Sequence, residues 1–214
     1  MIKISNLTKN YPKTKVFNQF SIEFREGEVT CVLGESGCGK TTLLNVIANL
    51  TDYEGEVDRV KCSYVFQTPN LFYNLTAREN LALVLGKNAD VDGFAEVLGV
   101  KGKLDSYPKR LSGGEAQRVA LIRGVMYSAD LLLMDEPFSS LDLSVKYRTM
   151  NVLRERFKKE NKTVIMVTHD IHEAVTMADR IIILSGGKIV YDNSEVNEKT
   201  EKELFGLLIG MNDN

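Results

Sequence analysis

The chain has 214 residues, a formal net charge of -2, 26% charged residues and 43% hydrophobic residues. This length suits one large domain, or a domain with a small subdomain, that buries roughly 70% of its unfolded surface. Because there is no large basic excess, bulk electrostatics do not indicate nucleic acid as a partner. No signal segment follows Met1 and no apolar run approaches the ~18 residues that cross a bilayer, so we expect a soluble, cytoplasmic chain.

The first 24 residues contain two stretches in which apolar and polar side chains alternate. They run from Ile2 to Ile4 and from Phe20 to Phe24, and the alternation is typical of half-buried antiparallel strands. The segment Tyr11 to Lys13 between them predicts a turn that carries an aromatic ring. We therefore expect an antiparallel β unit at the N-terminus.

Residues 29–41 combine a buried strand, a glycine-rich turn and the start of a helix. Val29 to Leu33 is apolar and lacks alternation, as in a strand buried on both faces. The sequence GESGCGKT at 34–41 matches the phosphate-binding pattern G-x-x-x-x-G-K-[ST]. Its glycines permit positive φ, and the helix N-terminus faces the same anion as the loop N–H groups. These features predict a phosphate site formed by Gly34, Ser36, Gly37, Cys38, Gly39, Lys40, Thr41 and Thr42.

Two side chains of this loop have specific expected tasks. Lys40 is expected to reach the β and γ phosphates, and the Thr41 hydroxyl is expected to bind Mg²⁺. Cys31, Cys38 and Cys62 lack C-x-x-C spacing and an even number, which argues against disulfides and zinc. We interpret Cys38 as a loop-filling residue; the alternative is an oxidisable thiol whose pKa is lowered by the positive potential of the loop.

The remaining elements follow in chain order. Glu54 to Glu56 predicts a turn, and Ser63 to Phe66 predicts a core strand. Between Thr68 and about Met126 the pattern becomes helical, with expected helices capped at Thr76, covering Phe94 to Leu98, and capped at Ser112. The C-terminal part predicts strands at 131–134 and 163–167, helices capped by Asp142 and Asp170, a hairpin of 180–184 with 188–191, and a short helix around 204–209.

The most specific feature is an ordered set of motifs: Tyr11, GESGCGKT, Gln67, LSGGEAQR at 111–118, LLLMDEP at 131–137, SSLD at 139–142 and Thr168-His169. From Tyr11 to about Tyr191 this set resembles the nucleotide-binding subunits of ABC transporters, and in detail those of importers of sulfonates, nitrate or polar small solutes. The resemblance implies an α/β P-loop NTPase core with a mixed sheet, an N-terminal antiparallel β subdomain and an inserted helical subdomain. We expect a single domain over 1–214, with its α/β core at 1–67 and 127–214 and its helical subdomain at 68–126.

The residues after the strand at 131–134 are the candidate catalytic centre. Two adjacent carboxylates at a strand end can divide their tasks, so that Asp135 holds Mg²⁺ and Glu136 polarises the attacking water. Gln67 is expected to bind Mg²⁺ or that water and, by the resemblance, to sense the membrane subunits. The resemblance also implies that His169 hydrogen-bonds to the γ-phosphate and that Tyr11 stacks on adenine. His172, just inside a helix, is expected to be an ordinary surface residue.

The tetrapeptide LSGG occurs twice, at 111–114 and at 184–187. The second copy lies between two β runs, where Gly-Gly predicts a hairpin turn. The first opens a capped helix, so its N-terminal N–H groups with Ser112, Gly113 and Gly114 are candidates for binding a γ-phosphate. Family geometry places this motif too far from the phosphate loop of its own chain. It therefore implies a head-to-tail homodimer, or a pair with another ABC subunit, that encloses two ATP molecules with Asp142 at the seam.

The resemblance implies an ATPase subunit that powers a separate transmembrane permease from the inner face of the membrane, with a solute-binding protein as an indirect partner and no nucleic acid. For Leu71, Phe72 and Tyr73 two interpretations stay open: a groove that receives a permease helix, or burial inside the helical subdomain. Import is favoured. The alternatives are the ATPase of a lipoprotein or peptide exporter and, less favoured, a non-transport ABC ATPase, for which the sequence lacks long heptad arms and a second cassette.

Overall fold

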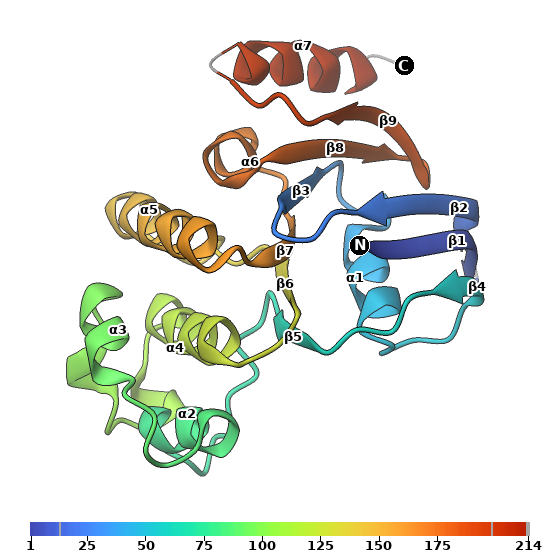
Figure 1. The fold of residues 1–214 in the computed structure, drawn as a ribbon. Coiled ribbons are helices and arrows are strands. Elements are labelled where there is room, and N and C mark those ends of the chain that lie inside the picture. Colours follow the sequence, from blue (N-terminus) through green and yellow to red (C-terminus); the bar gives the residue numbers. More distant parts are fainter. Residues whose placement is uncertain (13, 198, 213–214) are drawn as a thin grey trace.

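The computed structural model describes residues 1–12, 14–197 and 199–212. In these ranges the chain forms two β-sheets, and the larger one contains the parallel strands (Figure 1). Its strand order is β5-β6-β7-β3-β8-β9, in which β9 alone runs antiparallel to its neighbour. Every residue of β3, β6 and β7 is buried, as their runs without alternation predict. The strands are β3 (Val29–Leu33), β5 (Cys62–Val65), β6 (Leu131–Asp135), β7 (Thr163–Val167), β8 (Arg180–Ser185) and β9 (Lys188–Asn193).

The smaller sheet is antiparallel and has the order β2-β1-β4. Strands β1 (Ile2–Tyr11) and β2 (Thr14–Phe24) confirm the N-terminal β unit, while Lys13 of the predicted turn lies outside the described residues. The turn predicted at Glu54 is wrong, because those residues form β4 (Glu54–Val57) against β1. At Gly55, with φ +108°, an added Cβ would lie 2.6 Å from the carbonyl oxygen of Asn6. Only glycine therefore lets β4 approach β1 so closely.

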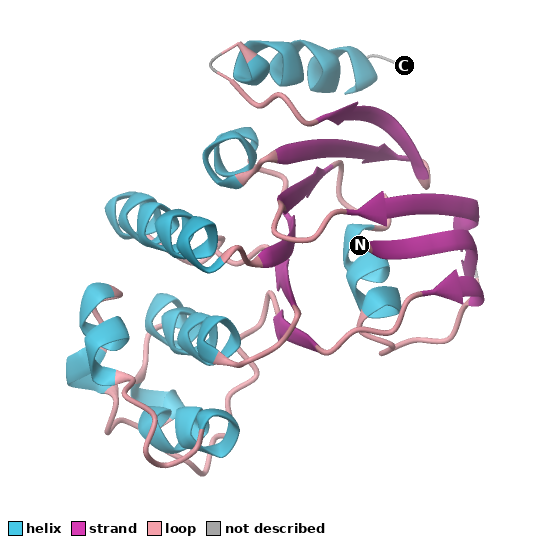
Figure 2. Cartoon of the chain, in the orientation of Figure 1, coloured by secondary structure: helices cyan, strands magenta, loops and turns pink. Residues whose placement is uncertain are grey.

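Helices cover the two faces of the larger sheet differently (Figures 1 and 2). On one face α1 (Lys40–Ile47) contributes to an apolar core shared by both sheets, whose members include Leu44, Phe20 and Ile165. The opposite face packs against a second core to which the later helices contribute. These helices are α4 (Gly113–Met126), α5 (Leu143–Glu160) and α6 (Ile171–Met177); α7 (Thr200–Asn212) lies on α6 and extends the predicted terminal helix in both directions.

The inserted helices are α2 (Ala77–Leu85) and α3 (Asp92–Val97), followed by the 3₁₀ turns η1 (Lys101–Lys103) and η2 (Pro108–Arg110). The capping boxes predicted at Thr76 and Ser112 are both present, each with its partner glutamate three residues later. Buried side chains of α2 and α3 share one apolar core with α4 and the larger sheet. Within the described ranges, no helix combines the length and apolar character that a bilayer crossing requires.

Two further local expectations have different outcomes. Gly186 and Gly187 have φ of +53° and +72° between β8 and β9, which confirms the second LSGG copy as a hairpin turn. Asp170 caps α6 by accepting from the backbone N–H groups of the first turn. Asp142 also stands at an N-cap position, but the predicted side-chain cap is wrong, because its carboxylate accepts no capping hydrogen bond.

Candidate active site

The phosphate loop joins β3 to α1 at the carboxyl ends of the parallel strands. A cavity of about 210 Å³ opens there, lined by Ser36, Gly37, Gly39, Lys40, Thr41, Thr42, Gln67 and Glu136. Gly39 has φ +112°, and an added Cβ would lie 2.7 Å from the Val16 side chain of β2. A polar cavity at a helix N-terminus, bounded by a loop that tolerates no side chain there, fits a phosphate group.

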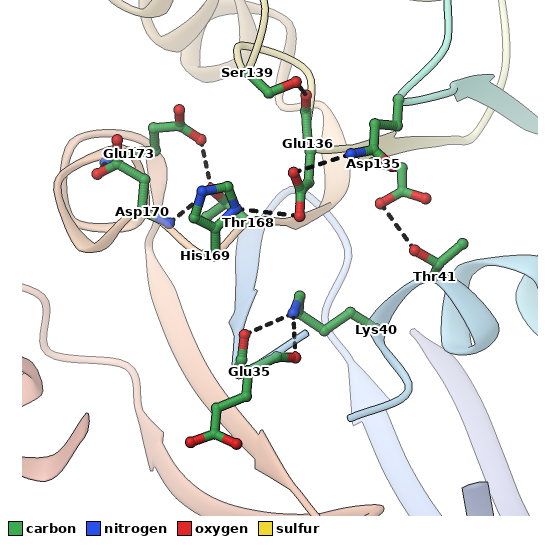
Figure 3. A network of polar contacts seen from close by, with 12 residues as sticks. Glu35, Lys40, Thr41, Asp135, Glu136, Ser139, Thr168, His169, Asp170 and Glu173 are labelled. Atoms are coloured by element: carbon green, nitrogen blue, oxygen red, sulfur yellow. Dashed lines mark hydrogen bonds and ion pairs between the residues drawn. The ribbon is translucent and has the colours of Figure 1, made fainter. Parts of the chain in front are cut away.

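Lys40 lies over the loop, nearly buried (Figure 3). Its ammonium donates to the carbonyl oxygens of Gly34 at 2.6 Å and Glu35 at 2.8 Å, and lies 4.0 Å from the Cys38 sulfur. Burial raises the pKa of the Cys38 thiol, and the opposing influence of Lys40 is smaller. A raised pKa is the opposite of what an activated thiol requires, so it favours the interpretation of Cys38 as a loop-filling residue.

The metal candidates Thr41 and Asp135 meet where α1 begins and β6 ends. The Thr41 hydroxyl donates to Asp135 Oδ1 at 3.2 Å (Figure 3). Burial raises the pKa of Asp135 and the Glu136 charge adds to the effect, although the Thr41 hydrogen bond and Lys40 oppose it. A buried carboxylate beside a hydroxyl offers the hard oxygen ligands that Mg²⁺ prefers, and a cation would compensate its charge. These residues therefore fit Mg²⁺.

Tyr64 on β5 is a site neighbour that sequence reasoning placed only in a core strand. Its hydroxyl lies 3.2 Å from Asn45 Oδ1, and its pKa is raised by burial and by the Asp135 charge. Its position follows from the pairing of β5 with β6, which no local pattern encodes.

Glu136 has a backbone conformation unusual for a residue with a side chain, with φ +43°. Its N–H donates to Val167 O at 3.0 Å, and its carbonyl accepts from the N–H and hydroxyl of Ser139. Gln67 Nε2 donates to one carboxylate oxygen at 3.3 Å. His169 Nδ1 lies 3.2 Å from the other carboxylate oxygen (Figure 3). The three predicted catalytic side chains thus converge from the ends of three neighbouring strands.

His172 lies outside this cluster, as expected. Its half-exposed ring packs edge-on against Tyr147, with centroids 5.0 Å apart, and its Nδ1 lies 3.6 Å from Glu201. These contacts belong to the packing of α5, α6 and α7, and they give His172 no direct link to the phosphate loop.

The other predicted nucleotide contacts are not brought together with the phosphate loop. In the part of the chain that the structure describes, the cavity is not lined by Tyr11, Ser112, Gly113, Gly114 or Asp142. The Ser112 hydroxyl accepts from Glu115 N at 3.2 Å within the capping box of α4. The Tyr11 ring is half exposed at the end of β1, with the Lys9 ammonium 4.8 Å from its centroid.

The three apolar residues 71–73 differ in their burial, so neither of the two interpretations, a groove for a permease helix or burial in the helical subdomain, applies to all of them. Leu71 is buried in the core, whereas Phe72 is 56% and Tyr73 80% exposed. The backbone of Phe72 is fixed by Asn80, which accepts from its N–H at 2.7 Å and donates to its carbonyl at 3.1 Å. A small, mostly apolar hollow lies nearby, lined by Leu75, Glu79, Ala82, Leu83 and Lys87.

Comparison with known proteins gives consistent matches. A family model described as "ABC transporter" matches residues 17–139. The chain is 39% identical over 194 residues to an aliphatic sulfonates import ATP-binding protein of Paraburkholderia xenovorans, covering 88% of this chain and 78% of that protein. It is 37% identical over 208 residues to a sulfate/thiosulfate import ATP-binding protein of Chromobacterium violaceum, covering 88% of this chain and 57% of that protein. The dimeric post-hydrolysis structure of the ATP-binding cassette MJ0796, bound to ADP and Pi, aligns with TM-score 0.80 and 31% identity over 90% of this chain and 98% of that chain.

Proposed function

The chain belongs to the ABC transporter family, and from this membership we propose that it is the ATP-hydrolysing subunit of a solute importer whose membrane-spanning subunits are separate chains. The observation that carries the proposal is the Glu136 carboxylate, held between Gln67 and His169 at a phosphate-loop cavity. The names of both sequence relatives described above specify import, which favours import over export. Sulfonates and inorganic sulfate define the class of solute to test first.

The roles of the individual side chains follow from their positions. Gly34, Ser36, Gly37, Cys38, Gly39, Lys40 and Thr42 would surround the phosphates, and Thr41, Asp135 and Gln67 would hold Mg²⁺, which supplies charge stabilisation at the phosphoryl group. Glu136 would accept the proton of the attacking water. Because His169 Nδ1 faces Glu136, the opposite ring nitrogen is left to bond to a γ-phosphate oxygen.

The proposed working unit is a dimer closed by ATP. Ser112, Gly113 and Gly114 would bind the γ-phosphate held by another copy or a paired ABC subunit, with Asp142 at the seam and Tyr11 on adenine. Two observations support this: these residues do not line the cavity of their own chain, and the aligned cassette structure is dimeric. We further propose 68–126 as the helical subdomain and 1–67 with 127–214 as the α/β core.

The exposed pair Phe72 and Tyr73 is the proposed contact with a cytoplasmic helix of the permease, which would hold the chain at the inner face of the membrane. Phe72→Ala is expected to reduce assembly with the permease and to lower transport-coupled ATPase activity, with little effect on the stability of the isolated chain. Leu71→Ala is the matched control, because removing a buried side chain costs about 2–5 kcal/mol of folding stability. Unchanged assembly and unchanged coupled activity in Phe72→Ala would show that permease docking does not use this face.

The whole proposal is tested by purifying the tagged full-length chain from native membranes and measuring ATP hydrolysis of the preparation. We expect a membrane-spanning protein to co-purify, and hydrolysis in the reconstituted complex to increase when a sulfonate or sulfate is supplied together with any solute-binding protein that it needs. A chain that hydrolyses ATP but associates with no membrane protein would contradict the transport function while leaving the ATPase assignment intact.

A further inference from the structure

We propose that Lys146 is a positioning residue for His169: the Lys146 ammonium, held between Asp170 and Glu173, joins the first turn of α5 to the turn that carries His169. The inference rests on the proposed function, because it deepens the role of His169 in ATP turnover. Lys146 belongs to a distant segment of the chain, and it contacts neither the phosphate-loop cavity nor Glu136.

The Lys146 ammonium lies 2.7 Å from Asp170 Oδ2 and 2.5 Å from Glu173 Oε1. The exposed fractions of the side chains are 17% for Lys146, 34% for Asp170 and 4% for Glu173, so solvent screens these pairs less than surface pairs. Burial by itself lowers the pKa of Lys146, but the two carboxylate partners outweigh it and the net shift is upward. The group is therefore a cation at neutral pH.

Both residues that flank His169 are bonded into this cluster (Figure 3). The Thr168 hydroxyl donates to Glu173 Oε2 at 2.5 Å and accepts from the Asp170 N–H at 3.1 Å. Asp170 in turn caps α6 by accepting from His172 N and Glu173 N. The His169 side chain is 65% exposed and its described partner is Glu136, so its position depends on the turn that carries it.

Without the Lys146 cation, the nearly buried Glu173 carboxylate would face Asp170 with no compensating charge. The two carboxylates would separate, and the hydrogen bonds that hold Thr168 and Asp170 would change with them. A shift of about 1 Å at a catalytic group can cost on the order of 100-fold in rate. ATP binding, which relies on the phosphate loop, would be affected much less.

The cluster also continues toward the proposed dimer seam. The Lys146 N–H donates to the Asp142 carbonyl at 2.8 Å, so Lys146 lies one helical turn after the residue proposed at the seam. Closure by a second copy would therefore act on the first turn of α5, and Lys146 would carry that displacement to the His169 turn. Lys146 thus links dimer closure to the geometry of the catalytic cluster.

The test compares purified full-length variants in Mg-ATP hydrolysis and nucleotide binding. Lys146→Met keeps an unbranched side chain that is one atom shorter, and it removes the charge. We expect kcat to fall about tenfold or more, with the ATP dissociation constant within about twofold of wild type. Lys146→Arg is expected to restore most of kcat. In a His169→Ala background, adding Lys146→Met is expected to cause no further loss, because both changes act on the same group.

Arg154→Met is the matched control on the same helix. Arg154 pairs with Asp179 at 2.5 Å, with side chains 28% and 41% exposed, and neither residue lines the phosphate-loop cavity. This variant is expected to lose stability but to keep its kcat. If Lys146→Met does not fold, Glu173→Gln provides the second variant, because it keeps an acceptor for Thr168 and removes the ion pair; the same fall in kcat is expected.

A wild-type kcat in the folded variants, an equal loss in Arg154→Met, or a full additional loss in the His169→Ala background would each overturn the inference. In those cases Glu136→Gln would still be inactive. Near-normal turnover in Glu136→Gln would instead overturn the proposed catalytic role of Glu136, so the two failures are distinguishable.

Discussion

Replacing Glu136 by Gln tests the catalytic assignment most directly, because the change removes one charge and the proton-accepting oxygen while keeping the shape of the side chain. The Gln67 amide, now 3.3 Å from the carboxylate, can still donate to the new amide oxygen. The backbone bonds to Val167 and Ser139 do not involve the side chain and stay in place. The positive φ is retained as well, since both residues are unbranched at Cβ.

The expected magnitude follows from the role of a general base. Such a group contributes about 10²–10⁴-fold, which corresponds to about 2.7–5.5 kcal/mol of transition-state stabilisation. The folding cost should be smaller, within about 1 kcal/mol, because the side chain is partly exposed and one hydrogen-bond partner is kept. A loss of at least ~100-fold in turnover therefore cannot come from unfolding.

The assay combines Mg-ATP hydrolysis, ATP binding and gel filtration of the full-length chain. We expect Glu136→Gln to bind ATP normally, to lose turnover by at least ~100-fold and to elute as a stable dimer only when ATP is present. A folded variant with near-normal turnover would refute the reasoning. Loss of ATP binding would show that Glu136 supports the site and not the chemical step.

Two further predictions concern the partner site and the metal site. Ser112→Ala and Thr76→Ala each remove one capping box, and each is expected to lower the free energy of unfolding in urea by about 1 kcal/mol. Only Ser112→Ala should weaken the ATP-dependent dimer. Equal weakening by both variants would contradict the partner role of Ser112. Burial raises the pKa of Asp135 in the folded chain above its unfolded value of 3.8, so the charged carboxylate destabilises the nucleotide-free fold at pH 7. Asp135→Asn should therefore increase thermal stability at pH 7. The gain should decrease as the pH falls through the raised pKa and vanish below 3.8. The same variant should lose Mg²⁺-dependent hydrolysis, and a stability gain that is independent of pH would contradict the electrostatic explanation.

The sequence by itself determined the features that local backbone chemistry controls. The phosphate loop, the capping boxes at Thr76 and Ser112, the hairpin at Gly186 and the buried strands lie where the patterns predict them. Each depends on residues within a few positions of one another, such as a glycine that accepts positive φ or a hydroxyl that reaches an N–H in the first turn. The motif order also identified the family, because the chemistry requires those residue types.

The tertiary structure decided what depends on pairing between distant segments. Glu54–Val57 becomes a strand because β1 offers it a free edge, although its own sequence reads as a turn. Leu71 and Phe72 are adjacent, yet packing buries one and exposes the other. Burial of the Cys38 thiol by its neighbours raises its pKa, and this effect is larger than the opposite effect of the adjacent Lys40.

The candidate site shows the same division. Motif resemblance named Gln67, Glu136 and His169 individually, but only the order of β5, β6 and β7 in the sheet places their strand ends side by side. Lys146 carries no motif, and its contacts with Asp170 and Glu173 arise because α5 packs beside α6. Local sequence fixes which groups can do the chemistry, whereas long-range packing fixes which groups meet, because contact energies between distant segments depend on the whole fold.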